Sequence, residues 1–294
     1  MPEYLGNGTL DVEIGGPGEL YTGSRFDHSG NIFQVTLDKK HTFCSFEKAD
    51  YNPVCGFGLL NEFDIDQPEG FSSTEAGDYF LKLGVGDLLR PNDAPYDFFY
   101  PYQYNPMSFK FAIKDSATIC FKTISNLVNG FQTVYNKVIS INKNLLTIDY
   151  YLMNIGDKSF TTEEYCHNFL SIDHEGITAD NKLEFNFDLH REQFAAFVDP
   201  DNTMTVGKNA ISWKNKPVND LFISELSGKT PQWATWKLTN SHAGVGVCEE
   251  INFEAAKVNL WGNGHVVSPE LFFRVNLLPG EETRWQRRYT FFYL

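Results

Sequence analysis

The sequence has no dense basic cluster and carries comparatively little positive charge. Its 294 residues include 24 Lys and Arg against 38 Asp and Glu, which gives a net charge of −14. A surface this acidic does not neutralise a row of phosphates. We therefore expect neither nucleic acid nor an anionic membrane surface as a partner.

A targeting or membrane segment is also missing. The first residues, MPEYLGNGTLDVEIGG, contain no basic n-region and no apolar h-region. No apolar run reaches the length that a bilayer requires. We therefore expect a cytoplasmic protein.

Cysteine is scarce and scattered. The five cysteines are odd in number and include no CxxC pair: Cys44, Cys55, Cys120, Cys166 and Cys248. This spacing offers neither a disulfide framework nor a zinc ligand set, so we expect reduced and mostly buried thiols. Cys166 precedes His167, which suggests a thiol nucleophile, but neighbours on a strand point to opposite faces.

A long segment with the period of an amphipathic helix is absent, whereas short alternating segments are frequent. In LLTIDYYLM (145–153) the residues on one face are Leu146, Ile148, Tyr150 and Leu152. Asn142-Lys143-Asn144 separates this segment from FQTVYNKVISI (131–141), which is a hairpin signal. Two further strands, ELFFRVNLL and RWQRRYTFFYL, are expected on either side of Pro279-Gly280-Glu281.

These patterns predict an all-β protein with antiparallel sheets. We find no internal repeat, low-complexity tract or linker, so one domain over residues 1–294 is the simplest interpretation. Residues 66–106 are rich in Asp, Gly, Pro and Tyr. We expect long loops there, over one end of the sheets, and loops of that length are commonly functional.

Three stretches carry side chains suited to chemistry. In GSRFDHSGNI (23–32), Arg25 offers a rigid fork of donors for sugar or carboxylate oxygens, although it could instead pair locally with Asp27. In TTEEYCHNFLSIDHEGI (161–177), His167 lies among carboxylates and can exchange a proton near neutral pH. A core imidazole bonded to backbone is the alternative for His167.

The third stretch is VVSPELFFRVNLLPGEETRW (266–285). If ELFFRVNLL is a strand, Glu270 begins a face that it shares with Phe272, Arg274 and Asn276. An ordinary solvent-facing glutamate remains the alternative.

Taken in order, these stretches resemble the aldose 1-epimerases, or galactose mutarotases. GSRFDHSG is similar to the family's "GR.ANRI" region, YCHNFLSI to its "NH.YFNL" stretch, and NLLPGEETRWQRRYTFFYL to its closing "L.PGE.y…Y.F" hairpin. The resemblance covers nearly the whole chain and implies an antiparallel β-supersandwich. It also implies a substrate-binding role for Arg25, a general acid at His167 and a general base at Glu270.

The sequence departs from the family pattern at two places. Glu270 lies nearer the Pro-Gly-Glu turn than the family's glutamate does. The family's second histidine has no counterpart in CGFGLLNEFDI or YFLKLGVGDLLR, where Glu62 or Lys82 could occupy its space. The chain therefore resembles a divergent branch of the family.

The resemblance implies a mutarotase that interconverts the α and β anomers of an aldose without a metal or organic cofactor. Asp173 would hold sugar hydroxyls, and Phe169 or Trp236 would stack on the ring. The most informative observation is whether His167 and Glu270 face each other across one cleft, at a spacing that fits a pyranose between them.

Three alternatives remain open. A non-catalytic carbohydrate-binding protein could use the same fold. A hexose-phosphate mutarotase would need a basic pocket, for which Arg25, Lys82 and Arg90 are the candidates. An accessory domain of a polysaccharide-degrading enzyme fits the sequence poorly.

Overall fold

The alternating segments of the sequence form strands because their apolar residues share one face. The central hairpin consists of β11 (Thr133–Asn142) and β12 (Leu145–Asn154), and Lys143 turns between them with a φ of 53°. The expected inward face of β12 is buried: Leu146, Ile148, Tyr150 and Leu152. This prediction is confirmed.

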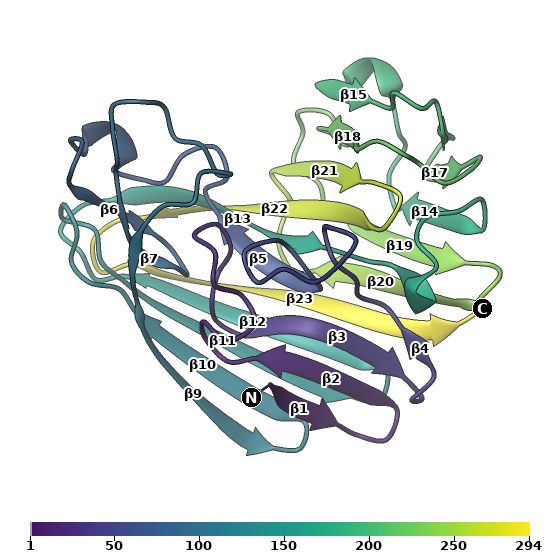
Figure 1. Cartoon of the computed structure of the whole chain (residues 1–294), viewed down its shortest axis with the longest axis horizontal. Helices are drawn as coiled ribbons and strands as arrows, with labels where there is room; N and C mark the ends of the chain where they lie inside the picture. Colours follow the sequence, from purple (N-terminus) through teal and green to yellow (C-terminus); the bar gives the residue numbers. More distant parts are fainter. Residues whose placement is uncertain (1) are drawn as a thin grey trace.

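The computed structural model describes residues 2–294 (Figure 1). Within this range all strand pairings between named strands are antiparallel and no α-helix occurs, which confirms the all-β class. Three short 3-10 turns are present, η1 (Phe71–Ser73), η2 (Ile172–His174) and η3 (Arg191–Gln193). No helix in these residues has the length and apolar character needed to cross a membrane.

The first large sheet runs in the order β1-β2-β3-β5-β13-β22-β21-β18-β15, with β4 paired to β3. Its strands are β1 (Glu3–Gly6), β2 (Leu10–Gly15), β3 (Asn31–Leu37), β4 (His41–Thr42), β5 (Leu59–Phe63), β13 (Phe160–Asn168), β15 (Ala196–Val198), β18 (Leu221–Ser224), β21 (Lys257–Gly262) and β22 (Val267–Leu277).

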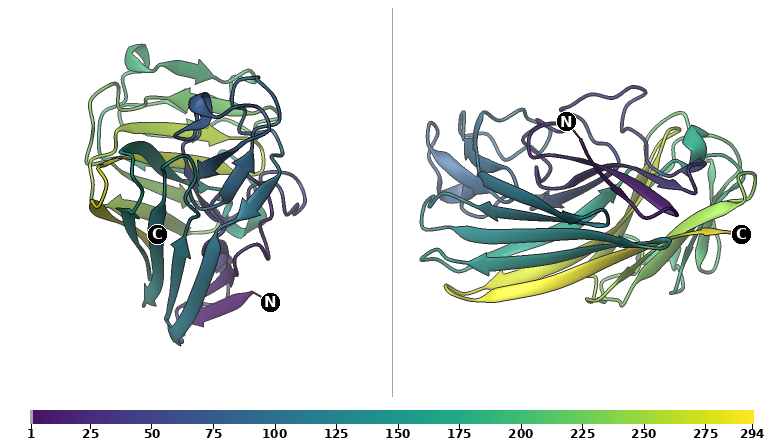
Figure 2. Two further views of the ribbon diagram at one scale, coloured as in Figure 1. Left: turned by 90° about the vertical axis from the view of Figure 1, so that its left-hand side faces the viewer. Right: turned by 90° about the horizontal axis from the view of Figure 1, so that it is seen from below.

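The second large sheet runs in the order β16-β17-β14-β19-β20-β23-β12-β11-β10-β9. Besides β11 and β12 it contains β9 (Ser108–Asp115), β10 (Thr118–Ile124), β14 (Asn181–Phe185), β16 (Met204–Val206), β17 (Ala210–Trp213), β19 (Thr235–Asn240), β20 (Val245–Ile251) and β23 (Glu282–Tyr293). The two large sheets lie face to face, as two further views show (Figure 2).

Residues 66–106 are not only loops, in contrast to the expectation from sequence. They form η1 and a whole three-stranded sheet: β6 (Tyr79–Lys82), β7 (Gly86–Leu89) and β8 (Tyr104–Pro106). This small sheet packs on its own aromatic cluster, which includes Phe71, Phe80 and Tyr102. Short strands separated by Gly and Pro give only a weak alternation in sequence, which is why the pattern does not reveal them.

The last two strands are formed as expected, but they do not make a hairpin. β22 pairs with β13 and β21 in the first sheet, whereas β23 pairs with β12 and β20 in the second sheet. The Pro279-Gly280-Glu281 turn therefore carries the chain from one layer to the other, and Gly280 has a φ of 83°. The resemblance to a closing hairpin is wrong in this respect.

The space between the two sheets holds a buried polar cluster as well as apolar side chains. Arg287 of β23 is fully buried and donates 2.8 Å hydrogen bonds to Glu164 of β13 and to Glu249 of β20. Buried charges are tolerated when each is paired and hydrogen-bonded, as these are. The cluster thus joins the sheets through three strands.

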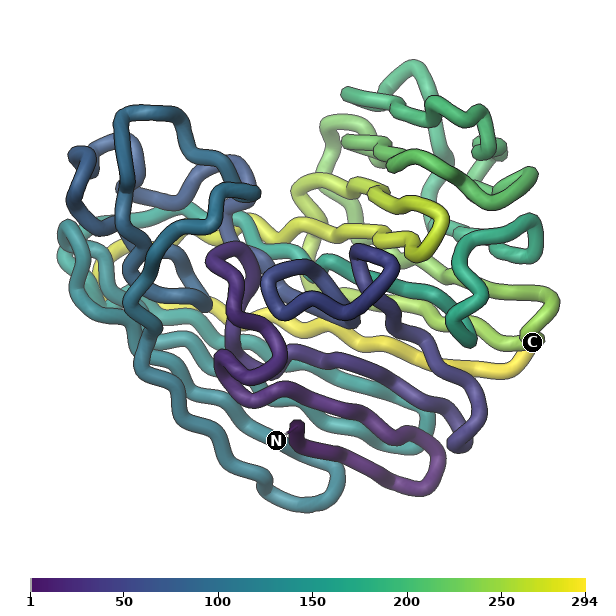
Figure 3. Tube along the Cα trace, in the orientation of Figure 1, coloured from purple at the N-terminus to yellow at the C-terminus, as the bar shows by residue number. Residues whose placement is uncertain are grey.

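The alternation of β13 directs neighbouring side chains to opposite sides of the first sheet. Glu164 and Cys166 point into the space between the sheets. Tyr165 and His167 point the other way, toward the connections that cross this sheet. The connection between β4 and β5 folds back over the sheet on that side, and residues 64–106 rise beside it (Figure 3).

Candidate active site

A cavity of about 370 Å³ lies on the outer side of the first sheet, and we name it the candidate cavity. Alternate residues of four adjacent strands form its floor: Tyr165 and His167 of β13, Glu270 of β22, Lys257, Asn259 and Trp261 of β21, and Phe222 of β18. Loop residues form its walls, among them Arg25, Glu47, Lys48, Phe98 and Phe99. Pockets that bind small molecules commonly have about 300–1,000 Å³.

His167 and Glu270 are neighbours on this floor. His167 Nε2 lies 3.5 Å from Glu270 Oε1. The β13–β22 ladder pairs Glu164 with Phe273, and the same register continued along both strands sets His167 opposite Glu270. Cross-strand partners on one face are close enough for their side chains to meet.

At this distance the two side chains do not face each other across a cleft with room for a pyranose between them. Both groups stand on one side of the cavity. This arrangement still suits a sugar, because the ring oxygen and the anomeric hydroxyl are bonded to the same carbon. An acid and a base that serve these two oxygens must themselves lie close together.

The His167 ring is fixed by aromatic neighbours. It stacks on Phe169 with centroids 3.9 Å apart and planes 3° from parallel, and Phe26 and Trp261 contact it edge-on at 5.9 and 5.2 Å. Burial holds the pKa of His167 well below its usual range, and Arg25 lowers it further. His167 Nδ1 has no hydrogen-bond partner among residues 2–294. A neutral imidazole is the form that this environment favours.

Glu270 is buried in the same apolar surroundings. Ser268 Oγ lies 3.2 Å from Glu270 Oε1, and the backbone N–H of Asn168 donates to Ser268 Oγ at 2.9 Å. Burial raises the pKa of Glu270 to about 8. The directions of the two pKa shifts favour a neutral imidazole on His167 and a protonated carboxyl on Glu270 near neutral pH.

Arg25 reaches the cavity from the segment before β3 and is held in place by fixed partners. Its Nε donates to Glu62 at 2.8 Å and its guanidinium donates to the Tyr165 hydroxyl at 3.1 Å. The rings of Phe26 and Phe98 lie 4.5 Å from the guanidinium carbon. A pre-organised guanidinium with donors left over can bind sugar hydroxyls at a small entropic cost. The local pair with Asp27 is not formed, because Asp27 binds Lys137 at 2.7 Å.

Glu62 and Lys82 lie behind Arg25 rather than on the cavity wall. Both are fully buried, and their charged groups are 3.7 Å apart. Lys82 also donates to the backbone oxygens of Phe63 and Asp64. They do not line the candidate cavity. Glu62 contacts Arg25 and Lys82 contacts Glu62, so neither is placed for the substrate contact expected from sequence.

Three further residues expected to contact substrate do not line the cavity. Phe169 is fully buried and covers one face of His167. Asp173 lies in η2, where its carboxylate pairs with His41 at 2.7 Å and accepts from the Thr42 N–H. Trp236 is buried in the second sheet and donates to Glu249 at 2.6 Å.

Several cavity residues were missed in the sequence. Lys257, Asn259 and Trp261 alternate within KVNLWG, and β21 pairs Asn259 with Glu270. This alternation could have identified the three residues as one face of a strand. Assigning that face to the cavity also requires knowing that β21 lies beside β22. Phe98 and Phe99 enter from the connection before β8, where no periodic pattern exists.

The five cysteines are all free thiols. Cys166 is buried on the opposite side of β13 from the cavity, and burial raises the pKa of its thiol to about 12. A thiol nucleophile beside His167 is therefore excluded by the direction of the side chain. Within residues 2–294 no group of three His, Cys, Asp or Glu side chains is arranged to hold a metal ion.

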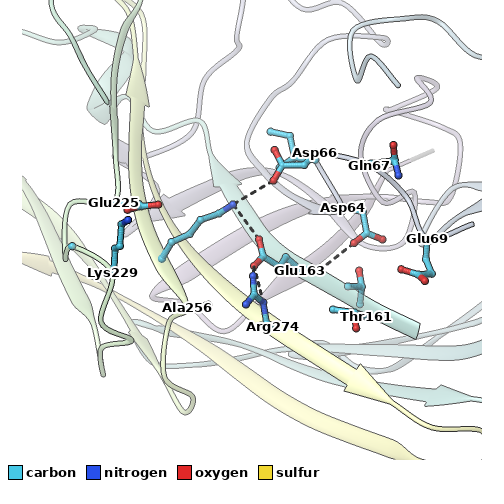
Figure 4. A pocket seen from close by; sticks show the side chains of 14 residues that line it. Asp64, Asp66, Gln67, Glu69, Thr161, Glu163, Glu225, Lys229, Ala256 and Arg274 are labelled. Atoms are coloured by element: carbon cyan, nitrogen blue, oxygen red, sulfur yellow. Dashed lines mark hydrogen bonds and ion pairs between the residues drawn. The ribbon is translucent and has the colours of Figure 1, made fainter. Parts of the chain in front are cut away.

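A second cavity, of about 440 Å³, adjoins the candidate cavity, and we name it the charged cavity (Figure 4). Ile65, Asp66 and Lys257 line both cavities. Two of its basic side chains are paired with a carboxylate, since Lys257 and Arg274 contact Glu163 at 3.0 and 2.6 Å. Figure 4 shows Arg274 beside Glu163. Lys257, which lines both cavities, thus contributes its charge to one of these ion pairs.

Solved structures share this architecture over nearly the full chain. The chain is similar to a galactose mutarotase-like protein from Lactobacillus casei, with a TM-score of 0.63, 11% identity, and coverage of 99% of this chain and 100% of that one. The chain is also similar to a galactose mutarotase related enzyme from Lactobacillus acidophilus, with a TM-score of 0.61 and 14% identity. That match covers 99% of this chain and 97% of the other chain. A third similar structure is that of an aldose epimerase homologue from C. elegans, with a TM-score of 0.53 and 13% identity over 100% of both chains.

The fold is that of the galactose mutarotase-like proteins. No family model matches the chain, and no curated protein matches it by sequence. At these identities the likeness establishes the galactose mutarotase-like fold, and the chemistry must be argued from the side chains in the candidate cavity.

Proposed function

We propose that the protein is an aldose 1-epimerase-like isomerase, which interconverts the α and β anomers of an aldose through its open chain. The observation that carries this proposal is the His167–Glu270 pair, 3.5 Å apart on the floor of a cavity of about 370 Å³. Two adjacent proton-exchanging groups with pKa values displaced in opposite directions are suited to concerted acid–base catalysis.

The protonation of the pair assigns the first step. Neutral His167 takes the proton of the C1 hydroxyl, while protonated Glu270 gives its proton to the ring oxygen. The bond between C1 and the ring oxygen breaks and a C1 carbonyl forms. This assignment of acid and base is the reverse of the one that the sequence resemblance implies, because burial favours the neutral form of both groups.

The return step restores the pair. Rotation about the C1–C2 bond presents the other face of the aldehyde to the C5 hydroxyl. Glu270, now a carboxylate, takes the C5 hydroxyl proton as the ring closes, and His167 returns its proton to the oxygen on C1. No proton is gained or lost in the cycle, and each proton transfer typically contributes about 10²–10⁴-fold to the rate.

A neutral sugar suits the cavity better than a phosphorylated one. The basic side chains in it already have anionic partners: Arg25 pairs with Glu62, Lys257 with Glu163, and Lys48 with Glu47. Lys82 and Arg90, the other basic candidates, do not line it. A phosphate dianion would need unpaired cations to offset its desolvation.

The test is equilibration of freshly dissolved α-glucose and α-galactose, followed by polarimetry or NMR with and without the protein. Acceleration above the buffer rate for at least one aldose, in a panel extended if both of these fail, supports the isomerase. Binding of sugars without any acceleration contradicts it and identifies a non-catalytic carbohydrate-binding protein on the same fold.

A further inference from the structure

A third cavity, of about 340 Å³, also adjoins the candidate cavity and shares no lining residue with the charged cavity. It is lined by seven aromatic residues. We name it the aromatic cavity; its rings are Tyr21, Phe26, Phe98, Phe99, Tyr100, Tyr102 and Tyr104. Five residues line both this cavity and the candidate cavity: Arg25, Glu47, Lys48, Phe98 and Phe99. The two cavities are therefore side by side.

Apolar surface is exposed at the aromatic cavity. The exposed fractions are 70% for Phe99, 42% for Tyr100 and 58% for Val54. Large apolar side chains gathered at one concave place commonly mark a binding site. The Tyr100 ring contacts Tyr102 at 4.8 Å, so it is held as a platform.

A carboxylate lies on the border between the two cavities. The Glu47 side chain is 13% exposed, and its Oε2 accepts the Gly56 N–H at 2.8 Å. The nearest cation to Oε1 is Lys48, at 3.9 Å. Glu47 thus keeps acceptor capacity for hydroxyl groups at the point where a ligand would pass from one cavity to the other.

We propose that the aromatic cavity is a subsite for a second sugar unit, so that the preferred substrates are reducing disaccharides or longer oligosaccharides. This proposal rests on the isomerase function proposed above. The reducing unit occupies the candidate cavity with its C1 at His167 and Glu270. The next unit stacks its C–H face on the exposed rings and directs hydroxyls to Glu47 and Lys48.

The chemistry of the aromatic cavity favours this occupant. A sugar presents an apolar face of C–H groups and an edge of hydroxyls, which matches rings bordered by one carboxylate and one ammonium group. The charged cavity is a poorer place for the second unit, because Glu163 is already satisfied by Lys257 and Arg274. A sugar there would compete with these ion pairs.

The test compares the mutarotation of monosaccharides and reducing disaccharides by the wild type. We expect kcat/KM for at least one of maltose, cellobiose and lactose to exceed that for glucose and galactose by about tenfold, the size of one good stacking contact. In parallel, calorimetry measures the Kd of the same sugars.

Two variants probe the subsite alone, because both residues line the aromatic cavity and not the candidate cavity. Tyr100→Ala removes the platform, and its hydroxyl has no side-chain bond to lose within residues 2–294. Val54→Trp fills the space. Both should remove the preference for disaccharides and leave monosaccharide kinetics unchanged. Lys229→Ala, in the charged cavity, is the matched control, and it should change neither the preference for disaccharides nor the monosaccharide kinetics.

The outcomes separate the two proposals. Equal or better use of monosaccharides, or an unchanged preference in Val54→Trp, overturns the subsite and leaves the isomerase standing. Loss of the preference in Lys229→Ala instead places the second unit in the charged cavity and also overturns it. Tight disaccharide binding that Val54→Trp abolishes, with no sugar isomerised, supports the subsite while the isomerase fails. Absence of both binding and isomerisation overturns both.

Discussion

The imidazole of His167 lies face to face with the ring of Phe169, at a centroid distance of 3.9 Å and an interplanar angle of 3°. The two residues are i and i+2 around the end of β13, so their side chains share one side of the sheet. Gly56 makes room for Phe169, because a Cβ there would lie 2.0 Å from its ring. A glycine and a phenylalanine thus fix the orientation of the histidine.

Replacing Phe169 by Leu should lower kcat for sugar isomerisation by about tenfold and change KM little. The imidazole loses the aromatic surface that orients it, and a small displacement of a catalytic group strongly reduces the rate of the chemical step. Phe57→Leu is the matched control, since Phe57 is buried in the same cluster and forms no ring contact with His167. Equal kinetic losses in the two variants would assign the effect to general destabilisation.

The rate should fall with rising pH as Glu270 loses its proton. The pKa of Glu270 is raised to about 8, so the protonated acid is present below that value and absent above it. The lowered pKa of His167 keeps the base neutral across the same range. We expect kcat/KM to be flat near neutrality and to decline above about pH 8. An increase of kcat/KM through this range would contradict the assignment.

The same shift predicts a gain in stability for Glu270→Gln at alkaline pH. A carboxyl whose pKa is raised on folding binds its proton more tightly in the folded state, so stability declines as pH rises from the ordinary value of 4.5 toward about 8. The glutamine variant lacks this decline. Its Tm should exceed that of the wild type by about 5–10 °C near pH 8, and the difference should vanish near pH 4. A lower Tm at both pH values would contradict the raised pKa.

The fold was more predictable from the sequence than the site. The alternation in residues 145–153 identifies a strand and its inward face without tertiary information. The neighbours of β22 depend on which strands meet in space, so ELFFRVNLL and RWQRRYTFFYL read as a hairpin although they belong to different sheets. Arg25, His167 and Glu270, which come from three separate stretches of the sequence, line one cavity in the structure.

Trp236 and Asp173 show why the remainder could not be predicted. An aromatic or acidic residue carries the same sequence signal whether it faces a sugar or a buried partner. The Trp236 indole N–H donates a hydrogen bond to the Glu249 carboxylate in the second sheet, and the Asp173 carboxylate pairs with His41. Their true partners lie 13 and 132 positions away along the chain, and only folding reveals them.

Arg287→Met should destabilise the protein by about 3–5 kcal/mol, because Glu164 and Glu249 would remain buried without their shared cation. Arg288→Met is the control on the next position of β23. Arg288 is half-exposed, and its partner Glu250 is 3.9 Å away, so the change should cost less than about 1 kcal/mol. Chemical denaturation measures both, and equal losses would contradict the account of the buried cluster.

The central claim is that Glu270 exchanges a proton with the sugar, and the most direct test is the anomerisation rate of Glu270→Gln. The variant keeps the shape of the side chain and can still donate a hydrogen bond, but it cannot transfer a proton. Exchange NMR on a sugar that the wild type isomerises should show kcat reduced by about 10²–10⁴-fold with KM nearly unchanged. Glu250→Gln, an exposed glutamate of β20, should keep the full rate. An undiminished rate in Glu270→Gln would contradict the claim.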